Sequence, residues 1–189
     1  RGRKSYSSSG AESFINELVD NKDIASFSDF DTNPQLEDLK KGIAQFNEGN
    51  FEIIIAIGGG SVLDMAKLIS VFAHQNHNIE DIVIGKVEIE NIKTPIIAIP
   101  TTAGSGAEAT QFSVLYINKK KFSIGSAIIL PDYVYLSSAF SISANAYLTA
   151  CSGLDAFCQA VESVWNVNAT EESLNYGLEA SKLIWDNLY

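Results

Sequence analysis

The chain has 189 residues, of which 46% are hydrophobic, and a formal net charge of −10. This length and apolar content suffice for one buried core, or for one domain and part of a second, and they exclude a disordered tail. The negative charge excludes a nucleic-acid-binding surface, because a phosphate backbone requires clustered basic residues. No apolar run is long enough to cross a bilayer and no signal peptide is recognisable, so we expect a cytoplasmic protein without membrane contact.

Two amphipathic helices are predicted in the first fifty residues. The first spans residues 9–21, with Ser9 as its candidate N-cap. The second has apolar residues at helical spacing from Leu36 to Phe46 and ends at Gly49. No strand precedes the first helix, so the sequence predicts a βα alternation whose first strand is missing.

A strand, a glycine loop and a helix follow. Residues 53–57 are an unbroken apolar run, which is typical of a parallel strand covered on both faces. Gly58-Gly59-Gly60 then allows a sharp turn and the close approach of a bound group, and a helix begins near Ser61. Unpaired amides at a helix N-terminus bind phosphate. The alternative is a tight turn without a ligand, because the loop matches neither common nucleotide-binding fingerprint.

A second strand and loop partly repeat this pattern. Residues 95–100 form a short apolar strand, and residues 101–108 form a loop of small residues. Two loops at the ends of neighbouring parallel strands face one crevice, where Thr101, Thr102 and Ser105 would offer hydroxyl groups. The alternative is an ordinary polar loop.

The pattern then changes from strands to helices. Residues 113–117 and 122–124 predict a hairpin, with Lys121 as the basic residue nearest the proposed crevice, and residues 133–136 predict one more strand. Helices are predicted over residues 145–152, over residues 153–165 and from Thr170 onward.

The predicted fold class is therefore α/β, a Rossmann-like doubly wound parallel sheet followed by the start of an all-α domain. We expect residues 1–140 to form a dinucleotide-binding domain without its first strands. Residues 141–189 would begin a helical domain that binds metal and substrate.

Asp155 and Gln159 lie four residues apart on the predicted helix over residues 153–165 and share one of its faces. A carboxylate with a second donor one turn later is acceptable spacing for metal ligands. The alternative is a solvated helix face, because two donors do not make a site.

Four motifs occur in an order that resembles the iron-containing (group III) alcohol dehydrogenase family. They lie at residues 58–67, 99–108, 130–132 and 152–157. The resemblance covers nearly all of this sequence but only the nucleotide-binding domain and the opening of the helical domain of the family, so we interpret it as a partial chain. Within the family, residues 159–165 look most like the subgroup that contains phosphonoacetaldehyde reductases.

The resemblance implies hydride transfer between NAD(P)H and a small aldehyde or alcohol in a cleft between two domains. Gly59, Gly60 and Ser61 match the family's pyrophosphate loop, whereas Thr101, Thr102 and Ser105 match its second cofactor loop. We also expect a homodimer or a larger homo-oligomer. No catalytic acid or base is identifiable in this sequence.

The resemblance also implies a divalent metal, Fe²⁺ or Zn²⁺, that polarises the carbonyl. Asp155 matches the family's first metal ligand. The family's iron enzymes have histidine one turn later, where this sequence has Gln159, and their two further histidine ligands come from downstream sequence. An amide oxygen is a poor substitute for imidazole, so Gln159 is at most a weak ligand.

The first residues bear on cofactor choice. In doubly wound folds an acidic residue after an early strand binds the ribose hydroxyls, while arginine accepts a 2′-phosphate. This sequence begins with Arg1, Arg3 and Lys4 and has no carboxylate there. We therefore predict NADP(H) rather than NAD(H), with Arg3 pairing with the phosphate. The alternative is a set of solvated basic residues at the chain terminus.

Two other functions compete with the dehydrogenase hypothesis. One is a dehydroquinate-synthase-like lyase, which shares the same nucleotide and metal layout. The other is a non-catalytic nucleotide-binding or assembly module, suggested by Gln159. The loop that begins at Thr101 favours the dehydrogenase over the lyase.

Overall fold

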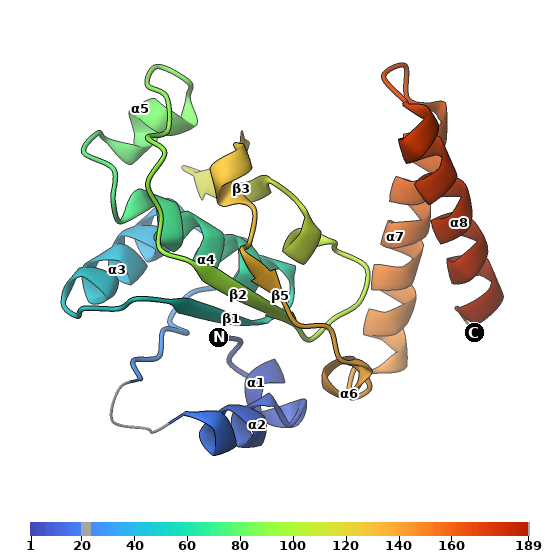
Figure 1. Cartoon of the computed structure of the whole chain (residues 1–189), viewed down its shortest axis with the longest axis horizontal. Helices are drawn as coiled ribbons and strands as arrows, with labels where there is room; N and C mark the ends of the chain where they lie inside the picture. Colours follow the sequence, from blue (N-terminus) through green and yellow to red (C-terminus); the bar gives the residue numbers. More distant parts are fainter. Residues whose placement is uncertain (20–23, 189) are drawn as a thin grey trace.

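A computed structural model describes residues 1–19 and 24–188 of the chain (Figure 1). A parallel sheet lies between two layers of helices, and the chain ends in two long antiparallel helices. The predicted α/β class and the helical second part are confirmed, whereas the domain boundary at residue 140 stays a prediction. Asn21, where the first helix was predicted to end, lies outside the described residues. No helix in the described part of the chain is both long and apolar enough to cross a bilayer.

The parallel sheet has the strand order β1-β2-β5. Strands β1 (Ile54–Gly58) and β2 (Ile96–Pro100) pair in register along their full length, so that Gly58 lies opposite Pro100. Both strands therefore end at the same edge of the sheet. Strand β5 (Tyr133–Val134) is shorter than the predicted 133–136, although Tyr135 still donates a backbone hydrogen bond to Ala98.

Alternate residues of β1 and β2 pack on opposite faces of the sheet, which explains the unbroken apolar runs. Ile57 and Ile99 pack in a buried cluster with Tyr6, Ile15 and Phe140 from helices below the sheet in Figure 1. The alternate positions face the opposite layer, where Ala56, Ile96 and Ala98 pack against Leu63 and Ala66.

Helix α4 (Gly60–Phe72) forms the centre of that opposite layer. It lies between the sheet and helix α3 (Leu36–Asn47), which begins as predicted and ends two residues before the predicted Gly49. The hairpin of β3 (Phe112–Ile117) and β4 (Lys120–Gly125) also packs on α4, and residues from all three elements share the largest buried cluster. Helix α4 is therefore buried on most of its surface, not only on the face toward the sheet.

Helix α2 (Ala11–Leu18) begins later than predicted. Gly10, in a left-handed conformation with φ of 80°, takes the N-cap position that was predicted for Ser9. The Ser9 hydroxyl accepts a weak hydrogen bond of 3.4 Å from the Ala11 amide. The remaining short elements are α1 (Ser5–Ser8), α5 (Ile79–Val83), η2 (Ala107–Ala109), η3 (Ala127–Ile129) and α6 (Ser138–Ser141).

The helical part contains α7 (Ala146–Trp165) and α8 (Glu171–Asn187). The prediction of two separate helices over residues 145–165 is wrong, because α7 continues through Gly153. A Cβ atom built on Gly153 would lie 2.4 Å from Leu188 Cδ1, so this glycine serves the close packing of the two helices rather than a break. The start of α8 is confirmed, with Thr170 as its N-cap in a capping box with Ser173.

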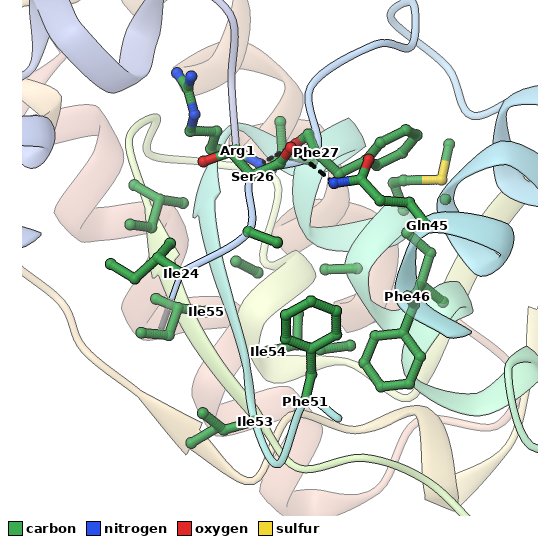
Figure 2. Close-up of a pocket in the computed structure, with 18 of the residues that line it drawn as sticks. Arg1, Ile24, Ser26, Phe27, Gln45, Phe46, Phe51, Ile53, Ile54 and Ile55 are labelled. Atoms are coloured by element: carbon green, nitrogen blue, oxygen red, sulfur yellow. Dashed lines mark hydrogen bonds between the residues drawn. The ribbon is translucent and has the colours of Figure 1, made fainter. Parts of the chain in front are cut away.

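A mostly apolar cavity of about 240 Å³ lies along β1 (Figure 2). In Figure 2, Ile53 and Ile55 lie on one side of β1, whereas Ile54 lies on the other side, next to Phe51. Because its lining includes residues from both faces of the sheet, the cavity follows the edge of β1 that β2 does not pair. None of the described residues that line it belongs to the two loops predicted to bind the cofactor.

Candidate cofactor-binding site

The loops that follow β1 and β2 lie in direct contact. The Thr101 amide donates a hydrogen bond of 2.9 Å to the Gly58 carbonyl. A Cβ atom built on Gly59 would lie 3.3 Å from Thr102 Oγ1, and one built on Gly60 would lie 3.2 Å from Ser105 Oγ. The predicted convergence of the two loops is therefore confirmed, while their binding of a cofactor stays a prediction.

The N-terminus of α4 opens at this contact. Gly59 is the N-cap and contributes no side-chain capping bond, and its carbonyl accepts the amide of Val62 at 2.9 Å. The amides of Gly60 and Ser61 precede the first intrahelical hydrogen bond and lie at the positive end of the helix dipole. The geometry is suited to an anionic group such as phosphate.

A third segment reaches the same helix end. The Asn33 amide donates a hydrogen bond of 3.2 Å to Ser61 Oγ, and Asn33 has a left-handed φ of 67°. The sequence analysis did not find Asn33. The signal was the dipeptide that it forms with Pro34, which is typical of a turn but does not say what the turn contacts.

Thr101 carries a buried hydroxyl group that needs a partner. Its side chain is almost fully enclosed, with the residue 4% exposed. Within the described part of the chain, Thr101 Oγ1 has no hydrogen-bond partner. A buried polar atom left unsatisfied costs about 1–3 kcal/mol, so a bound polar group would relieve this cost.

The second loop also contacts the helical part. Gly104 has a φ of +116°, and a Cβ atom built on it would lie 2.3 Å from the Ser152 carbonyl oxygen. The loop backbone therefore packs directly on the backbone of α7, and Figure 1 shows the segment after β2 extending toward that helix. A cavity beside this contact is lined by Ala103 and Gly104 of the loop, by Ser152 of α7 and by Leu188.

Asp155 lies one turn beyond this contact on α7. Gln159 Nε2 donates a hydrogen bond of 2.7 Å to Asp155 Oδ2, and both side chains are exposed. In the described ranges, no group of three or more His, Cys, Asp or Glu side chains is placed to hold a metal ion. The role of this pair as metal ligands stays a prediction.

The predicted basic residues lie apart from each other. Arg3 follows Gly2, whose amide donates to the Ile57 carbonyl at 2.8 Å, so Arg3 lies near the carboxyl end of β1. Its guanidinium donates to the Ser28 carbonyl at 2.8 Å and to Asp29 Oδ1 at 3.0 Å. Lys121 is exposed on β4, opposite Tyr116. Cofactor binding by Arg3 and Lys121 stays a prediction.

Lys67 is a buried residue next to the second loop that the sequence analysis did not assign. It lies on α4, only 1% exposed, and its ammonium donates to the carbonyl oxygens of Ala107, Thr110 and Phe112 at 2.8, 2.8 and 2.7 Å. Burial lowers the pKa of this ammonium, and the charges of Asp64 and Glu108 oppose that shift. The signal in the sequence was a lysine among the apolar residues of a helix that packs on a sheet.

Comparison with known proteins decides the family. The family model for iron-containing alcohol dehydrogenase matches residues 2–138. The chain belongs to the iron-containing alcohol dehydrogenase family. This match favours a dehydrogenase over the lyase that the sequence analysis left open.

Individual relatives agree with this family assignment. Long-chain-alcohol dehydrogenase 1 of Geobacillus thermodenitrificans is 34% identical over 160 residues, which cover 84% of this chain and 40% of the relative. Sulfoacetaldehyde reductase from Bifidobacterium kashiwanohense, solved in complex with NAD⁺, superposes with a TM-score of 0.91 at 28% identity. An iron-containing alcohol dehydrogenase from Thermotoga maritima superposes with a TM-score of 0.89, also at 28% identity.

The matches cover most of this chain but only part of each relative. The two solved structures are matched over 99% of this chain and over 50% and 52% of their own chains. This chain therefore spans about half the length of the solved relatives and 40% of the curated one.

Proposed function

We propose that this chain is the cofactor-binding part of an NAD(P)-dependent oxidoreductase that interconverts a small aldehyde and its alcohol. The observation that carries the proposal is the contact between the two loops at the N-terminus of α4. It places the helix-terminal amides of Gly60 and Ser61 against the second loop, whose first residue, Thr101, carries an unsatisfied buried hydroxyl. Family membership supports the same activity.

The chain's own residues would bind the cofactor chiefly through its phosphates. The amides of Gly59, Gly60 and Ser61 would donate to the pyrophosphate, and the close contact with the second loop would hold them in place. The hydroxyls of Thr101 and Thr102 would donate to or accept from the cofactor beyond the pyrophosphate. When bound, the nicotinamide supplies the hydride chemistry.

We further propose NADP(H) as the preferred cofactor, with the Arg3 guanidinium donating hydrogen bonds to the 2′-phosphate. The relative from Bifidobacterium kashiwanohense was solved with NAD⁺, so the proposal of NADP(H) rests on the residues of this chain alone. Arg3 has five N–H donors and uses two of its nitrogens, on Ser28 and Asp29. A phosphate dianion would compete with Asp29 for the exposed guanidinium.

Asp155 is proposed as one ligand of a divalent metal, Fe²⁺ or Zn²⁺, with further ligands from outside the described residues. Gln159 would orient the Asp155 carboxylate through the hydrogen bond already present, or contribute its own oxygen after rotation of the amide. When bound, the metal supplies Lewis-acid polarisation of the substrate carbonyl. The homo-oligomeric state and the cytoplasmic location stay predictions.

The test is an absorbance assay at 340 nm on the complete protein, with NADPH or NADH and a panel of small aldehydes. The panel includes sulfoacetaldehyde, the substrate named for one relative. Oxidation of the reduced cofactor that depends on an aldehyde supports the proposal. Tight cofactor binding without turnover of any aldehyde would contradict the enzymatic part and favour the non-catalytic module.

A further inference from the structure

We propose that Lys67 is a positioning residue that fixes the second cofactor loop against the first. This inference rests on the proposed function, because it concerns how the two loops are held for the cofactor. Lys67 does not line the crevice itself. It acts through the segment that follows the loop, which begins at Ala107.

The position of Lys67 on α4 links the two loops mechanically. The same helix begins at Gly60 in the first loop and presents Lys67 two turns later. The three carbonyl oxygens that Lys67 contacts lie between Ala107 and Phe112, immediately after the second loop. One helix therefore positions both loops, the first through its N-terminus and the second through this ammonium.

The chemistry of the contact requires a lysine. An ammonium has three N–H donors and no acceptor, and here it meets three carbonyl oxygens at 2.7–2.8 Å. A neutral apolar side chain would leave three inward-facing carbonyl groups without donors. The backbone of this segment would then turn toward water, because unpaired buried carbonyl groups are unfavourable.

Nearby charges support the ammonium in this buried position. Asp64 lies one turn earlier on α4, and Glu108 lies within the segment that Lys67 binds; both oppose the effect of burial on the lysine. Glu108 Oε2 is buried, with no hydrogen-bond partner among the described residues. Removal of the Lys67 charge would leave this carboxylate without its nearby cation, which adds to the displacement of the segment.

Two other contacts hold the loop, one at its first residue and one at its middle. Its first residue is bound to Gly58 through the Thr101 amide, and its middle packs on α7 at Gly104. The end of the loop, next to Ser105, is held by the Lys67 contact and by Ala107, which is buried in a cluster with Leu63 and Ala66 of α4. Loss of this contact should release Ser105 from Gly60 and lower cofactor affinity, with a smaller effect on the chemical step.

The experiment compares Lys67→Met and Lys67→Gln with the wild type in the complete protein. Lys41→Met is the matched control, because it removes an exposed lysine from the neighbouring helix α3. For Lys67→Met we expect a rise of roughly tenfold or more in the Kd of NAD(P)H, with kcat at saturating cofactor within about threefold of wild type. Lys67→Gln keeps two N–H donors, so its Kd for NAD(P)H should lie between those of wild type and Lys67→Met. The Kd of Lys41→Met should equal that of wild type.

Amide hydrogen exchange supplies a readout that does not depend on activity. We expect faster exchange in the variants over residues 101–112, with β1 and the core face of α4 unchanged. Unchanged cofactor affinity with unchanged exchange there would overturn the proposal. Faster exchange throughout the protein would also overturn it, because Lys67 would then be a general stabiliser. If the wild type binds no cofactor, the proposed function fails, and the exchange result still decides whether Lys67 positions the loop.

Discussion

The α/β part of this chain and its helical pair are held in different ways. The three buried apolar clusters are built from residues between Tyr6 and Phe140. Helices α7 and α8 pack chiefly on each other, and each contributes one buried residue, Ala160 and Gly177. Large apolar side chains on them, such as Tyr147 and Trp165, are 81% and 74% exposed.

This difference bears on the two candidate sites. The candidate cofactor site is made largely of backbone groups at the ends of buried strands, so the α/β core positions these groups. The metal site depends on the side chains of Asp155 and Gln159, which are exposed and fixed only by their helix and their mutual hydrogen bond. The first site can therefore be tested as a formed structure and the second only as part of the complete protein.

The largest expected effect is on the helical side. Asp155→Ala in the complete protein should remove bound metal and lower activity by roughly a hundredfold or more, because carbonyl polarisation contributes several kcal/mol to transition-state stabilisation. Metal content by elemental analysis and turnover are measured together. Asp186→Ala, an exposed aspartate on α8, is the control. Full activity in metal-free protein would refute the metal role and favour a metal-independent enzyme.

The next largest effect is on the glycine loop. Gly60→Val should weaken cofactor binding by roughly tenfold or more, because its side chain would crowd Ser105 and cover the amides at the start of α4. Calorimetric titration with NAD(P)H measures the change. The double variant Gly60→Val with Ser105→Gly separates the two causes. Recovery of wild-type affinity in the double variant would show that crowding alone, and not covered amides, explains the loss.

A smaller effect is expected on cofactor preference. Arg3→Asp should shift the ratio of kcat/KM for NADPH over NADH toward NADH by about tenfold, because a charge-assisted bond to phosphate is worth about 1.5–3 kcal/mol. Asp29→Asn should shift the ratio the other way, because it weakens the competing ion pair of 3.0 Å. If neither variant changes the ratio, Arg3 does not contact the ribose.

The smallest effect concerns pH and stability. Burial raises the pKa of Asp64 above its ordinary value of 3.8, against the opposing hydrogen bond from the Val114 amide. Between 3.8 and the folded pKa the unfolded chain binds fewer protons than the folded chain, so this group lowers stability as pH rises. Urea unfolding of wild type and Asp64→Asn at several pH values in this window should therefore show that the free energy of unfolding decreases more steeply with pH in the wild type. Parallel curves would mean that Asp64 titrates normally.

The sequence predicted those parts of the fold that depend on local pattern. The isoleucine-rich runs of β1 and β2 indicated buried parallel strands, and the loops after them were correctly expected to meet. The continuity of α7 was not predicted, because Gly153 serves Leu188, a partner 35 residues away that no local pattern shows. Lys67 was missed for the same reason, because its three acceptors are 40 to 45 residues further along the chain.

The contact between Gly104 and Ser152 has a consequence for motion. No side-chain atom separates the backbones of Gly104 and Ser152. A rotation of α7 relative to the sheet would therefore displace the loop that carries Thr101 and Ser105. Cofactor binding, as proposed, would then be thermodynamically linked to the orientation of the helical pair. The coupling is reciprocal: a cofactor that favours one orientation of the helical pair would bind more tightly when the pair is already in that orientation.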